Sequence, residues 1–301
     1  MILGVWKYAL LVFLGGCSYG VVSTFVKLAY GEGFTQGEIT GSQYLLGAVM
    51  LWFVAVFVPK VKLTGKQIVT LLISGFPMGL TGILYNKSLT YVDASFAIIL
   101  LLQFTWISFV LQYIFDKKAP SKKNSIATVV ILLGSILASG IMASDGDFSL
   151  VGIIFGLLSA TSFASFIVVS GRSTIEIHPI HKSALMTTGA ALLILIVFPP
   201  VFLLNGTLMD GLFKYSMVAG LCASVIPPLF FNIGMPKIGS GLGTILSASE
   251  LPMAVLMSAL VLNETVTGVR WIGVMIILCG IAYPNMKVRW KRKILPEPIE
   301  L

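Results

Sequence analysis

The sequence predicts an all-α polytopic membrane protein, with ten transmembrane helices arranged as two inverted five-helix repeats around a central cavity. Three observations predict this fold. Of the 301 residues, 57% are hydrophobic and only 11% are charged, whereas a soluble domain carries about 25% charged residues. Most apolar runs reach the roughly 20 residues needed to cross a bilayer. Polar residues also recur at matched places in the two halves of the chain.

The apolar runs predict ten spans in order, joined by short loops. The first run is too long for the core of a signal peptide and lacks a clear cleavage site, so we interpret it as a span. Prolines such as Pro77 and Pro252 fall inside spans, where the backbone groups that they free must be satisfied by neighbours or line a cavity. The expected bounds are residues 8–29, 39–58, 67–87, 94–115, 125–143, 150–170, 183–204, 214–234, 241–262 and 268–285.

The basic residues predict how the chain is oriented. With ten spans, most of the 20 Lys and Arg residues, including the cluster from Lys287 to Lys293, fall on the side that holds both termini. The positive-inside rule places that side in the cytoplasm, so we expect a multi-pass protein of the cell membrane. The basic tail is expected to contact anionic lipid headgroups. The net charge of +8 therefore reflects membrane topology, and we expect no nucleic-acid partner.

Two pairs of polar residues mark an internal repeat. Asn86 and Asn232 are 146 positions apart, and Gln103 and Glu250 are 147 positions apart. An odd number of spans in each half would invert the second copy, as in secondary transporters whose substrate sites lie at the repeat interface. The predicted units are residues 1–145 for the first repeat, 146–286 for the second and 287–301 for the tail.

One motif in the second half resembles a known family. The segment Ser247-Ala248-Ser249-Glu250-Leu251-Pro252-Met253 is followed by Leu262-Asn263-Glu264-Thr265-Val266-Thr267 and then by Gly273 and Gly280. With two five-span repeats, this is similar to the EamA family of the drug/metabolite transporter superfamily. The first half departs from the pattern, because Gln103-Phe104-Thr105-Trp106 lacks the proline and Lys117 stands where the second half has Glu264. The resemblance implies a ten-span metabolite exporter or permease.

Glu250 is the acid that the predicted spans place deepest in the membrane. A carboxylate in lipid costs at least a few kcal/mol and normally faces a cavity or a partner. Helical spacing puts Gly243, Ser247, Glu250 and Ala254 on one face, which forms a small and polar stripe suited to a pore wall. Glu250 is therefore expected either to couple transport to protons or to contact a substrate amine. The alternative is a structural acid that is protonated or hydrogen-bonded.

Other polar and aromatic residues inside spans are candidates for substrate contact. Asn86 and Asn232 lie near span ends, where a structural role in satisfying freed backbone groups is favoured. For Gln103 the alternative is a hydrogen bond between helices, worth about 1 kcal/mol, and for the aromatic residues it is helix packing. The candidates besides Glu250 are Gln103, Asn86, Asn232, Ser247, Tyr19, Ser18, Gln43, Tyr44, Tyr85 and Trp106.

The sequence favours a secondary transporter that moves small metabolites, either amino acids or amphipathic and drug-like compounds, and that acts as an exporter by alternating access. A facilitative carrier and an intramembrane enzyme are the alternatives, although an enzyme would need clustered catalytic groups in the spans. No ATP-binding loop is present. The expected partners are a small-molecule substrate and the lipid bilayer, while proton coupling and the choice between monomer and homodimer stay open.

We expect no cofactor and no metal. His178 and His181 lack a third ligand for zinc, and the Asp145–Asp147 loop is too incomplete for calcium. Phosphorylated substrates are disfavoured, because Lys27 and Lys87 are the available cations and both lie near span ends, where snorkelling to the interface is expected.

Overall fold

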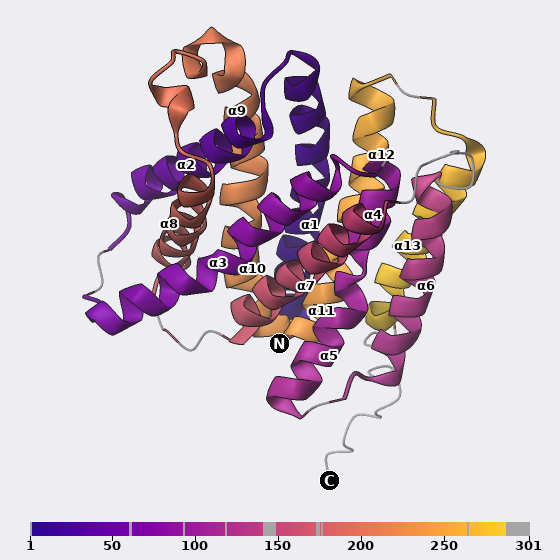
Figure 1. The fold of residues 1–301 in the computed structure, drawn as a ribbon. Coiled ribbons are helices and arrows are strands. Elements are labelled where there is room, and N and C mark those ends of the chain that lie inside the picture. The colour runs from indigo at the N-terminus through magenta and orange to yellow at the C-terminus, as the bar shows by residue number, and fades with distance from the viewer. Residues whose placement is uncertain are drawn as a thin grey trace.

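The computed structural model is a bundle of helices, most of which run across the same layer (Figure 1). It describes residues 2–59, 62–92, 94–117, 119–140, 149–172, 175, 177–263 and 265–286. Glu264 and the predicted tail, residues 287–301, lie outside the described residues. The first half forms α1 (Ile2–Gly31), α2 (Gln36–Ala55), α3 (Gly65–Ser88), α4 (Ala94–Leu102), α5 (Phe104–Asp116) and α6 (Lys122–Ser139). The second half forms α7 (Leu150–Arg172), α8 (Pro179–Val197), α9 (Phe213–Ala219), α10 (Ile226–Ile238), α11 (Ser240–Ser247), α12 (Glu250–Val261) and α13 (Gly268–Met286).

The described helices have the lengths and composition of membrane spans. Eight helical stretches within the described ranges are long and apolar enough to cross a bilayer. α2 is not among them, and the apolar part of α13, Gly268–Pro284, is shorter than the other eight. α2 carries Gln36, Glu38 and Gln43 in its first half, which lowers its hydropathy. The chain is a multi-pass membrane protein, and the count of ten spans stays a prediction.

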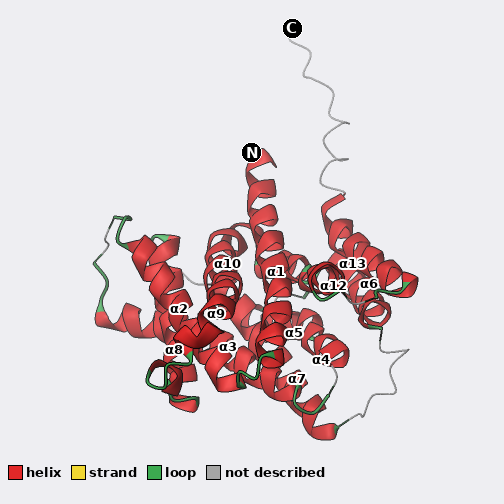
Figure 2. Cartoon of the chain, turned by 90° about the horizontal axis from the view of Figure 1, so that it is seen from above, coloured by secondary structure: helices red, strands yellow, loops and turns green. Residues whose placement is uncertain are grey.

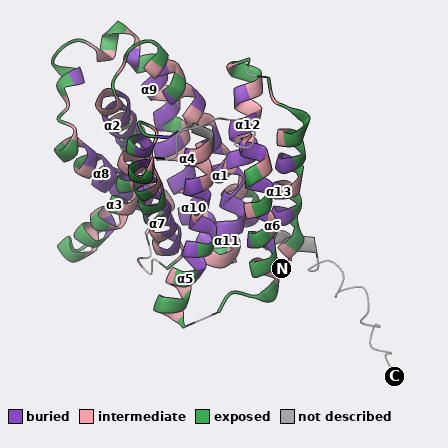
Figure 3. Ribbon diagram, turned by 45° about the vertical axis from the view of Figure 1, so that its right-hand side comes forward, coloured by how far each residue is buried: buried purple, intermediate pink, exposed green. Residues whose placement is uncertain are grey.

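Buried residues lie between the helices and exposed residues cover the outside of the bundle (Figure 3), but the exposed surface is strongly apolar. Large apolar side chains such as Phe53 and Ile196 are 67% and 79% exposed on the outside. Hydroxyl side chains such as Ser42, Thr187 and Ser216 are fully buried between helices. Lipid solvates the apolar exterior, while small polar residues hold neighbouring helices together from within.

Two of the predicted continuous spans are broken, and the breaks fall at the polar positions of the repeat. Span 94–115 divides into α4 and α5 at Gln103, and span 241–262 divides into α11 and α12 at Ala248 and Ser249. Glu250 is consequently the first residue of α12. Gln103, Ala248 and Ser249 keep right-handed helical φ and ψ angles, so each span is locally distorted at its break and is not unwound.

Local capping sequences move several span ends from their predicted positions. α2 begins at Gln36 because Thr35 and Glu38 form a capping box, in which each side chain bonds the backbone of the other residue. α8 begins at Pro179, whose fixed φ suits the first helical turn, and ends at Val197 just before two prolines. α6 ends at Ser139, because Gly140 takes a left-handed conformation.

The predicted eighth span contains a wide helical turn. A π-helical turn, Gly220–Val225, separates α9 from α10, whose first turn holds Pro227 and Pro228. Ser18 donates its hydroxyl to the Cys222 carbonyl at 2.9 Å, and Thr187 donates to the Ser224 carbonyl at 2.9 Å. Side chains from α1 and α8 therefore satisfy backbone groups at this irregular turn.

The first helix of each half packs against helices of the other half. α1 packs against α10, α11 and α12 of the second half, while α7 packs against α3, α4 and α5 of the first half. α2 and α3 both pack against α8, and α6 packs along α13. Seen from above, α1 lies in the middle of the bundle, with α2 and α8 to one side and α6 and α13 to the other (Figure 2). The interface between the halves is therefore the core of the molecule.

Glycines let α3 and α8 approach closely where they cross. A Cβ added to Gly75 would collide with the Met186 carbonyl, and one added to Gly189 would collide with the Leu72 carbonyl. Because both obstacles are backbone, the collision cannot be relieved by turning a side chain. Small residues at such crossings maximise the packing that holds membrane helices together.

We predict that Gly75→Ala destabilises the protein by about 1–3 kcal/mol, because one extra methyl group at this crossing forces α3 and α8 apart. The measurement is the melting temperature of the purified protein in detergent. Gly82→Ala is the matched control on the same helix, since a Cβ there would meet its nearest atom, on Tyr44, at 3.5 Å. Equal melting temperatures for the two variants would contradict the role assigned to the crossing.

Candidate functional site

A cavity of about 560 Å³ lies between the two halves of the chain. Helices α1, α2 and α3 supply most of its first-half wall, and α12 supplies most of its second-half wall. Its volume falls within the range of about 300–1,000 Å³ that is typical of small-molecule sites. Of the candidates from the sequence, the cavity wall includes Tyr19, Gln43, Tyr44, Tyr85, Asn86 and Glu250.

The cavity extends to one face of the bundle. Beyond Tyr19 and Glu250, its wall continues to Tyr30 near the end of α1, Gln36 at the start of α2 and Leu262 just after α12. These helix ends lie at the top of Figure 1, opposite the face on which α1 begins. We call the Tyr19–Glu250 end the floor of the cavity and the opposite end its rim.

Close helix packing seals the bundle below the floor. A Cβ added to Gly16 would collide with the Ser249 hydroxyl, and one added to Gly20 would collide with the Glu250 carbonyl. A Cβ on Gly234 would lie 2.8 Å from the Tyr8 carbonyl. α1 is thus pressed closely against α10, α11 and α12 below the floor, while the residues that line the cavity continue to its rim.

Glu250 supplies the carboxylate at the cavity floor. Among the residues that the structure describes, none donates a hydrogen bond to its side chain. Tyr19 and Tyr85 lie near enough to interact electrostatically with it. As the first residue of α12, it also lies at the positive end of a helix dipole. An acid in this position is available to a proton or to a cationic group that enters the cavity.

Aromatic rings form the wall around this carboxylate. The rings of Tyr19 and Phe163 meet edge to face, with centroids 5.3 Å apart, and both residues line the cavity. The Tyr44 hydroxyl donates to the Met78 carbonyl at 3.0 Å, which fixes its ring. An aromatic wall beside a carboxylate suits a ligand with a cationic head and an apolar body.

Three buried polar atoms of the cavity wall have no hydrogen-bond partner within the described part of the chain. They are the hydroxyls of Tyr19 and Tyr30 and the Oε1 atom of Gln43. Buried polar groups in proteins are almost always hydrogen-bonded. These three atoms are therefore the groups that water or a ligand in the cavity would satisfy.

Asn86 and Asn232 make equivalent contacts in the two halves. The Asn86 amide donates to the Thr40 hydroxyl on α2 at 2.8 Å, and the Asn232 amide donates to the Ser183 hydroxyl on α8 at 3.0 Å. Both bonds are buried and join neighbouring spans. Asn86 also lines the cavity, whereas Asn232 does not. Each asparagine thus joins two neighbouring helices through a side-chain hydroxyl.

Four other candidates lie away from the cavity wall. Trp106 is 44% exposed on the surface, and its Nε1 donates to the Gln103 Oε1 atom at 2.8 Å. Gln103 also donates to the Ile99 carbonyl at 3.0 Å. The hydroxyls of Ser18 and Ser247 donate to main-chain carbonyls, that of Ser247 to Gly243 at 2.9 Å. The structure therefore does not bring these residues together with Glu250.

The cavity wall also contains residues that the sequence analysis did not select. Lys27 and Arg270 both line it near the rim, and the Arg270 Nε donates to the Ala138 carbonyl at 3.1 Å. Helical spacing from Tyr19 through Ser23 to Lys27 is the signal that could have identified Lys27. Arg270 could not be found in this way, because it lies at the end of the predicted span 268–285 and no sequence pattern directs it into a cavity. No group of three or more His, Cys, Asp or Glu residues suited to a metal occurs among the described residues.

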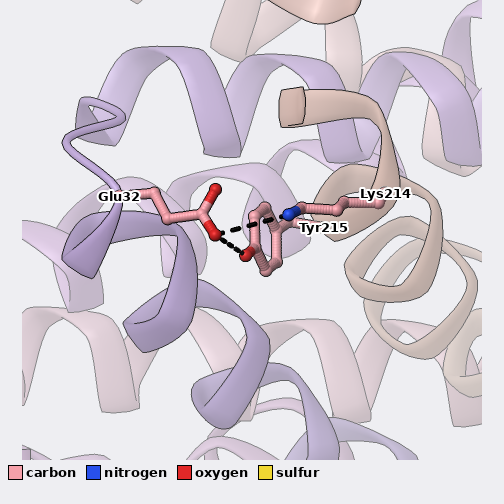
Figure 4. Close-up of polar contacts among 3 residues, drawn as sticks. All are labelled: Glu32, Lys214 and Tyr215. Carbon is pink, nitrogen blue, oxygen red and sulfur yellow. Dashed lines mark hydrogen bonds and ion pairs between the residues drawn. The ribbon is translucent and has the colours of Figure 1, made fainter. Parts of the chain in front are cut away.

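A cluster of charged and aromatic residues joins the two halves on the face where the cavity opens (Figure 4). Glu32, just after α1, accepts a hydrogen bond from the Tyr215 hydroxyl and pairs with the Lys214 ammonium at 3.3 Å. That ammonium also lies 4.6 Å from the centroid of the Tyr215 ring. The hydrogen bond from Tyr215, followed by the interactions with Lys214, lowers the pKa of Glu32.

Comparison with known proteins matches the chain twice to the model of the EamA-like transporter family, at residues 6–140 and 150–285. The uncharacterized transporter YcbK of Bacillus subtilis is 24% identical over 290 residues, which cover 91% of this chain and 92% of that protein. The uncharacterized transporter sll1319 of Synechocystis is 24% identical over 222 residues, which cover 70% and 64%.

Two further matches extend this comparison. GDP-fucose transporter 1 of Dictyostelium discoideum is 33% identical over 159 residues, which cover 49% of this chain and 42% of that protein. A crystal structure with 15% sequence identity superposes with a TM-score of 0.72 and covers 91% of this chain and 98% of the other. At this identity the superposition shows a shared fold.

We predict that Glu32 stabilises the protein in a pH-dependent way. Because its pKa is lowered by folding, the stabilisation is present above the ordinary glutamate pKa of about 4.3 and is lost as the pH falls through the lowered value. The wild type should therefore melt at a higher temperature than Glu32→Gln at about pH 7, and the gap should close near pH 3. Tyr215→Phe, which removes the hydroxyl donor, should show the same trend. A gap that is independent of pH would rule out the ionised carboxylate as its source.

Proposed function

Because the chain belongs to the EamA-like transporter family, we propose that it is a secondary transporter of the cell membrane that exports small metabolites, either amino acids or amphipathic compounds. The observation that carries this proposal is the Glu250 carboxylate at the floor of a cavity that extends to one face of the bundle. Membership of a transporter family favours transport over catalysis.

Alternating access of two inverted repeats is the proposed mechanism. If α2 and α13 also cross the membrane, each half has five spans, and the second copy is inverted. The exchanged contacts of α1 and α7 support this arrangement, as do the paired breaks at Gln103 and before Glu250. Rocking of one half against the other would open the sealed face and close the rim around a fixed site.

The direction of transport follows from the proposed topology. With both termini in the cytoplasm, the rim of the cavity faces the outside. An external proton could then reach Glu250 and displace a cationic group of the substrate. After the cavity turned inward, loss of the proton would free Glu250 for the next substrate molecule. This cycle exchanges an internal solute for an external proton, and so drives export.

A single chain is sufficient for the proposed transport unit. The first and second halves of one chain both contribute to the cavity wall, so a second copy is not needed to form it. We therefore propose that a monomer transports, whether or not two copies associate in the membrane. Lipid and a small-molecule substrate are the partners that this unit requires.

The proposal is tested with purified protein in liposomes that contain a pH-sensitive dye. A panel of amino acids and small amphipathic amines is added outside, and wild type is compared with Glu250→Gln. We expect solute entry with proton movement in the wild type and loss of the proton movement in the variant. Glu32→Gln, which removes a carboxylate outside the cavity, should behave as the wild type at neutral pH.

Two results would change the proposal. Equal solute movement without protons in wild type and Glu250→Gln would indicate a facilitative carrier in which Glu250 is structural. No movement of any solute on the panel would contradict transport of these metabolite classes.

A further inference from the structure

Three charged side chains line the cavity among the residues that the structure describes, and they are unevenly distributed. Glu250 lies at the floor, whereas Lys27 and Arg270 lie near the rim. Lys27 is one turn from the end of α1, and Arg270 is in the first turn of α13. Among the described residues, the acid and the two basic residues of the cavity wall therefore lie at opposite ends.

The length of α12 gives the distance between these ends. α12 begins at Glu250, and Leu262, the residue after it, lines the rim. At 1.5 Å per residue this segment spans about 18 Å. The bond from the Arg270 Nε to the Ala138 carbonyl holds that side chain against the end of α6, at the level of the rim. After allowance for the reach of both side chains, the acid and the base are separated by on the order of 10 Å.

The floor is suited to a primary ammonium group. Such a group has three N–H donors and no acceptor. The Glu250 carboxylate and the unpartnered Gln43 Oε1 atom are acceptors on the floor, and the unpartnered Tyr19 hydroxyl is another. The face of an aromatic ring gives a cation further stabilisation. A quaternary ammonium would leave the acceptors unsatisfied, because it has no N–H to donate.

The wall between floor and rim is largely apolar. Val22 and Val26 come from α1, Leu101 comes from α4, and Ala254 and Val255 come from α12. No carboxylate other than Glu250 lines the cavity within the described residues. A ligand that occupied both charged ends would therefore place an apolar chain along this wall.

We propose that the substrate is an elongated dipolar molecule, with an ammonium group bound at Glu250 and an anionic group bound at Arg270. This inference deepens the proposed function and rests on it. An α-amino acid carries both charges on one carbon and cannot reach the two ends at once. Molecules with an amine and a carboxylate at opposite ends of a chain, as in ω-amino acids and short peptides, have the required chemistry.

Two isomers test the charge separation directly. 6-Aminohexanoate and 2-aminohexanoate have the same composition, but only the first places its charges at opposite ends. Binding to purified protein in detergent is measured by titration calorimetry, with hexylamine and hexanoate as single-charge references. We expect 6-aminohexanoate to bind about tenfold more tightly than its isomer, as one added charge-assisted hydrogen bond would give. Equal affinities for the two isomers would overturn the inference.

Variants assign each end of the ligand to its residue. Arg270→Gln should weaken 6-aminohexanoate about tenfold and leave hexylamine unchanged, whereas Glu250→Gln should weaken both. Arg270→Lys, which keeps the charge, should retain most of the affinity. Lys87→Gln is the control, because Lys87 lies near the end of α3 and does not line the cavity. An equal loss of both ligands in Arg270→Gln would show that Arg270 does not contact the anionic end.

Two outcomes separate this inference from the proposed function. If Arg270→Gln does not fold, the comparison of isomers on the wild type still decides the result. If neither isomer binds, the inference fails, while transport of other solutes in the liposome assay would leave the proposed function standing.

Discussion

Placing a carboxylate inside a membrane requires a polar or water-filled space around it, and the interior of this bundle is arranged to provide one for Glu250. α12 begins at Glu250 because the predicted ninth span breaks at Ala248 and Ser249. The break leaves the carboxylate against a cavity instead of against lipid. Tyr19 and Tyr85 come from the other half of the chain to complete its surroundings, so the site exists only where the two halves meet.

Packing between the halves depends on small residues. Lipid offers no hydrophobic gain for helix association, so stability comes from close contact and from buried hydrogen bonds. Gly20 allows α1 to lie directly against the start of α12, which closes the bundle below Glu250. The hydrogen bonds from Asn86 to Thr40 and from Asn232 to Ser183 tie neighbouring spans within each half. Hydrogen bonds such as that from Ser249 to the Phe13 carbonyl also join the two halves, so packing and hydrogen bonds together hold them in place.

The sequence predicted the membrane class and the two repeats, because apolar length and repeated polar positions are local signals. It also predicted several residues of the cavity wall, since Tyr19, Tyr44 and Glu250 are polar groups in the middle of apolar runs. It could not predict that Arg270 lines the cavity, because its position depends on how α13 packs along α6. It also could not show that Gln103 lies away from the cavity wall, because two local hydrogen bonds, with Trp106 and with the Ile99 carbonyl, hold that side chain.

The hydrogen bonds of Gln103 explain why only the second repeat supplies the polar group of its break to the cavity. Gln103 and Glu250 occupy matched breaks in the two repeats, and a symmetric protein would direct both into the cavity. The Gln103 amide is instead occupied by Trp106 and by the Ile99 carbonyl, whereas Glu250 has no hydrogen-bond donor among the described residues. The polar group at the break of the first repeat is therefore hydrogen-bonded along its own helix, whereas that of the second repeat lines the cavity. A single carboxylate lies at the floor of the cavity and cations lie near its rim, so the two ends differ in charge. Two equivalent breaks would not have produced this difference.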